Sequence, residues 1–130
     1  MIPPLIERHA EKLKRVHAGV ELKELPTNQV QAVIIEVPDV ELPPGWNKSR
    51  TTIRFLVPLA YPAAPPDCFW ADADLALHGG RAPQGSGRQP IPGLPDPLLW
   101  FSWHVQQWDP NRHTLASFFQ VVKDRLWKAL

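Results

Sequence analysis

The residues of this sequence with the greatest chemical potential are one cysteine and five histidines. Cys68, His78 and His104 are candidate catalytic residues, because thiols and imidazoles supply nucleophiles and general bases. Ser102 with His104 could instead act in ester chemistry. A small metal-dependent hydrolase is a further alternative, with ligands from His78, His104, His113 and Cys68. No two of these have the close spacing typical of metal motifs, so we expect no metal ion and no cofactor.

Cys68 itself is predicted to be buried and unreactive. It lies in a short predicted strand in alternation with Trp70, so both side chains should share the inner face of that strand. A thiol among apolar neighbours has a raised pKa and little thiolate at neutral pH. The alternative is an exposed Cys68 beside a cation such as Arg81 or a protonated His78, which would make it a nucleophile.

The composition describes a single small domain over residues 1–130. The chain is 44% hydrophobic, and its 14 basic residues nearly balance its 13 acidic ones, so no strong field attracts nucleic acid. No apolar run approaches the roughly 18 residues of a membrane span. Pro3-Pro4, followed by Glu7 and Arg8, argues against a secretory segment. We expect a cytoplasmic protein that binds neither nucleic acid nor membranes.

The elements that must position these residues follow from hydrophobic spacing. Residues 5–17 and 113–128 each carry apolar side chains at helical spacing, and Thr114 or Asn111 can cap the second helix. Strands are predicted near residues 20–25, 30–37, 51–58 and 67–71. Their connections are too short for parallel crossovers, so the pattern predicts an α+β fold with a four-stranded antiparallel meander.

Residues 79–97 have a different composition. They contain five glycines and five prolines, a content that favours turns over packed elements. We therefore predict a long, flexible surface loop between the meander and the C-terminal helix.

The order of these elements resembles the ubiquitin-conjugating (UBC) fold. The segment TTIRFLVPLAYPAAPPDCFWAD is similar to that family's third strand, its YPxxPP corner and its fourth strand. Leu77-His78-Gly79-Gly80 stands near the position of its His-Pro-Asn motif, and WDPNRHTLASFFQVVKDRL resembles its W-x-P turn and second helix. The proline content and short C-terminus are most similar to the prokaryotic ubiquitin-conjugating-like proteins of family E.

The resemblance implies a UBC-like component of a bacterial ubiquitin-like conjugation pathway. Its expected partners are a ubiquitin-like protein and a ThiF-type activating enzyme. The implied binding surfaces are the basic face of the first helix, with Arg8, Lys12, Lys14 and Arg15, and the aromatic segment with Trp100, Trp103 and Trp108. The basic face could also be an ordinary solvated helix face.

The sequence departs from the family at the catalytic position. The family's cysteine lies about eight residues before the W-x-P tryptophan, where this chain has Trp100. Gly80 takes the place of the family's oxyanion asparagine and has no side chain to stabilise a tetrahedral intermediate. The two C-terminal helices of the full fold are also missing from the pattern. Whether the protein is an enzyme stays open, with Cys68 as an acceptor in an unusual place being the alternative to a binding component.

Overall fold

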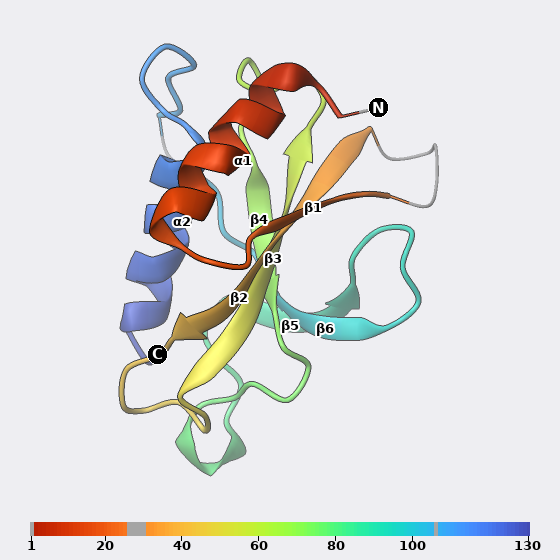
Figure 1. The fold of residues 1–130 in the computed structure, drawn as a ribbon. Coiled ribbons are helices and arrows are strands. Elements are labelled where there is room, and N and C mark those ends of the chain that lie inside the picture. Colours follow the sequence, from red (N-terminus) through yellow and green to blue (C-terminus); the bar gives the residue numbers. More distant parts are fainter. Residues whose placement is uncertain (1, 26–30, 106) are drawn as a thin grey trace.

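The computed structural model describes residues 2–25, 31–105 and 107–130 (Figure 1). In this part of the chain the two α-helices are α1 (Pro4–Val16) and α2 (Leu115–Trp127). The strands are β1 (Glu21–Glu24), β2 (Ala32–Glu41), β3 (Arg50–Pro58), β4 (Asp67–Ala71), β5 (Ser86–Pro90) and β6 (Pro97–Phe101). Both predicted helices and all four predicted strands are confirmed to within a few residues, except that residue 30 lies outside the described ranges. Neither described helix is long and apolar enough to cross a membrane.

The strands form one antiparallel sheet with the order β1-β2-β3-β4-β6-β5. The α+β class is therefore confirmed, but the sheet has six strands and not four. The two additional strands, β5 and β6, form a hairpin in which Ser86 pairs with Phe101 and Pro90 with Pro97. The prediction of a flexible loop over residues 79–97 is wrong, because β5 and the start of β6 lie within it.

The glycines and prolines of this segment occupy positions that a hairpin tolerates. Pro92 and Gly93 lie in the turn closed by the bond from Leu94 N–H to the Ile91 carbonyl, at 2.9 Å, and Gly93 has a φ of 88°. Pro90 lies at the end of an edge strand, where a missing donor costs little. Ile91 is buried and anchors the hairpin against Ile34 and Trp70.

The main core lies between the sheet and the two helices, which cover the same face (Figure 1). Residues Leu115, Phe118 and Phe119 begin the buried stripe of α2. Phe118 packs on Phe55 of β3, with ring centroids 5.0 Å apart. The expected packing of the C-terminal helix on the sheet is thus observed.

Arg125 connects the C-terminal end of α2 to the segment that precedes β5. Its guanidinium donates hydrogen bonds of 2.9–3.0 Å to the carbonyls of Gln84, Lys128 and Leu130. The same group lies over the rings of Phe101 and Trp103, 5.2 and 5.8 Å from their centroids. This buried cation therefore joins the helix, the hairpin and the chain after β6.

Candidate functional site

Cys68 lies at an irregularity where β4 pairs with β3. Arg54 pairs with Trp70 but Leu56 pairs with Asp67, so β4 holds one residue more than β3 between these pairs. Cys68 takes up this bulge with a φ of 58°, the left-handed region that favours glycine. Such a conformation costs on the order of 1 kcal/mol in a residue that is not glycine.

The inward orientation predicted for Cys68 is wrong. Phe69 and Ala71 are the β4 residues that enter the main core, so strand alternation directs Cys68 and Trp70 to the opposite face. The two side chains do share a face, as predicted, and both line a cavity of about 430 Å³ there. Cys68 is therefore partly exposed and not a core residue.

The structure brings a carboxylate and an imidazole to this thiol. Nδ1 of His104 and Oδ1 of Asp67 are 2.5 Å apart. One donor atom from each of Asp67, Cys68 and His104 lies within 4.8 Å of those of the other two, and we call these three residues the thiol cluster. The backbone N–H of Cys68 donates to the Trp103 carbonyl at 2.9 Å, which holds the segment after β6 beside the start of β4.

Cys68 and His104 are candidate residues on the sequence alone, but Asp67 is not. Asp67 gave one signal, its position next to the cysteine, but neighbours in a regular strand point to opposite faces. His78 is not part of the cluster: it is exposed in the 3₁₀ turn His78–Gly80, where its N–H donates to the Gly45 carbonyl at 2.8 Å. Ser102 is exposed, and its N–H donates to the Gly85 carbonyl.

The surroundings of the thiol favour its protonated form. Burial raises the pKa of Cys68, and the negative charge of Asp67 acts in the same direction. Hydrogen bonds from the Trp103 backbone and the Trp100 side chain offset part of this increase in pKa. The direction is the one that the sequence predicted, although the thiol lies on the other face of the sheet.

The three tryptophans proposed as a binding segment have different surroundings. Trp100 is half-buried and lines the cavity beside Cys68. Trp103 is exposed beneath the Arg125 guanidinium. Trp108 is half-buried, and its indole N–H donates to the Pro62 carbonyl at 2.8 Å. Trp108 therefore stabilises the YPxxPP corner.

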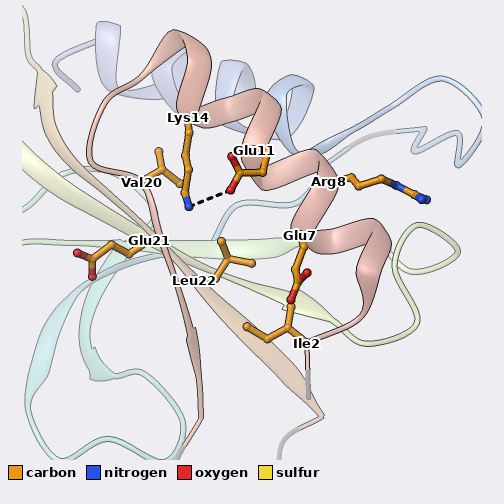
Figure 2. A pocket seen from close by; sticks show the side chains of 8 residues that line it. All are labelled: Ile2, Glu7, Arg8, Glu11, Lys14, Val20, Glu21 and Leu22. Atoms are coloured by element: carbon orange, nitrogen blue, oxygen red, sulfur yellow. Dashed lines mark hydrogen bonds and ion pairs between the residues drawn. The ribbon is translucent and has the colours of Figure 1, made fainter.

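The basic face of α1 divides into two parts. Arg8, Lys12 and Arg15, at positions i, i+4 and i+7, form one exposed line that we call the basic stripe. Lys14 lies apart from it and forms an ion pair with Glu11 at 3.2 Å. Figure 2 shows the Lys14 side chain extending toward Glu11, while the end of the Arg8 side chain points in another direction; all three residues line the groove between α1 and β1. The groove between α1 and β1 encloses about 560 Å³.

A polar contact fixes α1 against the YPxxPP corner. The hydroxyl of Tyr61 and Nδ1 of His9 are 2.5 Å apart, and burial raises the pKa of Tyr61 to about 12. The hydroxyl is therefore protonated at neutral pH, and it forms a hydrogen bond with Nδ1 of the imidazole. Tyr61 also packs on Trp108, with ring centroids 6.2 Å apart. Helix α1, the corner and the W-x-P turn thus form one packed unit.

Acidification is expected to weaken this unit through His9. Burial lowers the pKa of His9 from its usual 6.5, and the charges of Lys12 and Arg8 lower it further. Between the lowered pKa of the folded state and about 6.5, the unfolded chain therefore binds more protons than the folded chain, and stability is lost as the pH falls from about 6.5 through the pKa of the folded state. Urea unfolding at a series of pH values should show a smaller acid loss in His9→Gln than in the wild type. Equal acid losses in the two chains would contradict this role.

The family model described as prokaryotic E2 family E matches residues 6–129. No curated protein and no solved structure matches the chain.

Proposed function

Since the chain belongs to the prokaryotic E2 family E, we propose that it acts in a ubiquitin-like conjugation pathway by binding a ThiF-type activating enzyme, a ubiquitin-like protein, or both. In this proposal it positions its partners and carries no thioester at the family's usual place. Trp100 occupies that place in the sequence, and in the structure it is a half-buried residue of β6.

The basic stripe is the observation that carries this proposal. Its three side chains are exposed, and none of them forms an ion pair with any residue that the structure describes. Unpaired cations at helical spacing can meet a partner's carboxylates without first giving up an internal contact. Because the Tyr61 contact holds α1 against the corner, the stripe is presented on a rigid element.

Direct binding tests the proposal. The purified chain is titrated into the cognate activating enzyme, and separately into the ubiquitin-like protein, at low and at high ionic strength. We expect saturable binding to at least one of them, with an affinity that falls as salt increases. Absence of binding to both proteins at low salt would contradict the proposal.

A second candidate function is favoured by the thiol cluster. With His104 taking the thiol proton, the Cys68 sulfur could attack the thioester carbonyl of a ubiquitin-like protein held by the activating enzyme. The new carbon–sulfur bond forms as the old one breaks, and the leaving thiolate regains the proton. A reductant-sensitive adduct that needs ATP and disappears in Cys68→Ala would establish this function. Under the leading proposal, the wild-type chain forms no such adduct.

A further inference from the structure

We propose that the thiol cluster is a binding site for one zinc ion. The cluster joins residues from two segments far apart in the sequence, the start of β4 and the chain after β6. This inference goes beyond the proposed function and concerns a different face of the molecule from the buried core beneath the helices.

The donor set is one that zinc prefers. A thiolate, an imidazole and a carboxylate together suit borderline-soft Zn²⁺, whereas Mg²⁺ and Ca²⁺ take oxygen ligands almost exclusively. Three protein ligands leave one tetrahedral position for water or another ligand. The adjoining cavity of about 430 Å³, walled by Trp70 and Trp100, has room for that fourth ligand.

The distances between the donor atoms of the thiol cluster are close to those in a zinc-bound site. Zinc lies about 2.3 Å from sulfur and about 2.0–2.1 Å from nitrogen, which places tetrahedral ligands roughly 3.3–3.7 Å apart. The donor atoms of the cluster already lie within 4.8 Å of one another. To complete the site, the 2.5 Å distance between Nδ1 of His104 and Oδ1 of Asp67 would lengthen by about an ångström. Any distance to the sulfur near the 4.8 Å limit would shorten by about an ångström.

The bulge in β4 explains how neighbouring residues come to face one imidazole. In a regular strand, Asp67 and Cys68 would point to opposite faces of the sheet. The left-handed conformation of Cys68 breaks this alternation and leaves the carboxylate and the thiol on the same side. The hydrogen bond from Cys68 N–H to the Trp103 carbonyl then holds His104, the next residue, beside them.

Cobalt serves as the spectroscopic probe for this site. The reduced, metal-free chain is titrated with Co²⁺ and then with Zn²⁺. We expect one equivalent of Co²⁺ to bind with a thiolate-to-cobalt charge-transfer band, which Zn²⁺ then removes. Cys68→Ser should abolish the band, and His104→Ala should weaken binding at least tenfold. His78→Ala, which changes an exposed histidine outside the cluster, is the matched control and should bind like the wild type.

Alkylation gives a second, independent measurement. One equivalent of Zn²⁺ should slow the reaction of Cys68 with iodoacetamide at least tenfold, and this protection should be lost in His104→Ala. Circular dichroism establishes that each variant is folded. Absence of the cobalt band in the wild type, or an unchanged band in His104→Ala, would overturn the proposal. Because these measurements use the chain alone, their failure leaves binding to the activating enzyme untouched, and the reverse also holds.

Discussion

Arg125→Ala is expected to lose about 3 kcal/mol of unfolding free energy. Only 5% of the surface of Arg125 is exposed, and its guanidinium donates to three backbone carbonyls, that of Gln84 before β5 and those of Lys128 and Leu130 after α2. Alanine would leave these acceptors without their donor and would remove the group that packs over the rings of Phe101 and Trp103. The loss should therefore exceed that of any exposed substitution in α2.

Chemical denaturation at equilibrium measures this effect. Arg125→Lys should recover only part of the loss, because a single ammonium cannot reproduce the planar fork that reaches three carbonyls. Lys128→Ala, an exposed change at the same end of the molecule, is the control and should stay within about 0.5 kcal/mol of the wild type. A loss below about 1 kcal/mol in Arg125→Ala would show that water replaces the guanidinium without difficulty.

Reversal of charge in the basic stripe is the second large effect that we expect. The double change Lys12→Glu and Arg15→Glu should weaken binding to the activating enzyme by about tenfold or more at low salt. The difference between variant and wild type should shrink as ionic strength increases, because exposed charges are screened over about 10 Å at 0.1 M salt. The melting temperature should change little, since both side chains are exposed and neither forms an ion pair with a residue in the described ranges 2–25, 31–105 and 107–130.

A control variant with the same change in net charge outside the basic stripe distinguishes direct contact between the stripe and the activating enzyme from attraction by the overall charge of the chain. Arg81→Glu with Arg112→Glu alters two exposed residues of the loops. This control should bind nearly as tightly as the wild type. Equal losses in the two double variants would mean that only the overall charge matters. If the Lys12 and Arg15 variant binds the activating enzyme with unchanged affinity, the stripe is an ordinary solvated helix face.

The sequence predicts those parts of the fold that depend on local patterns. Helix α2 follows from its apolar spacing and from Thr114, whose side chain does accept from Ser117 N–H as a cap. The β5–β6 hairpin was not predicted, because glycine and proline counts do not distinguish a loop from a hairpin. That distinction depends on position: Gly93 lies in the turn and Pro90 on an outer edge.

The thiol cluster could be predicted only in part, for a related reason. Local alternation correctly places Cys68 and Trp70 together but does not say which face of β4 meets the helices. The contact between Asp67 and His104 joins residues 37 positions apart, and it depends on a bulge that the sequence does not reveal. β4 pairs with β6, although β5 lies between them in the sequence. This pairing, and the site that it creates, depend on the tertiary structure and not on local sequence patterns.

The strand order also bears on self-association. The sheet ends in β1 on one side and β5 on the other, and these strands have only four and five residues. Glu21, Lys23 and Glu24 place charges along the first edge, and Pro90 removes a donor from the second. Short, charged or proline-containing edges are poor templates for a strand from another chain. Both ends of the sheet are thus unsuited to growth of intermolecular β-structure, and we expect concentrated solutions to resist fibril formation.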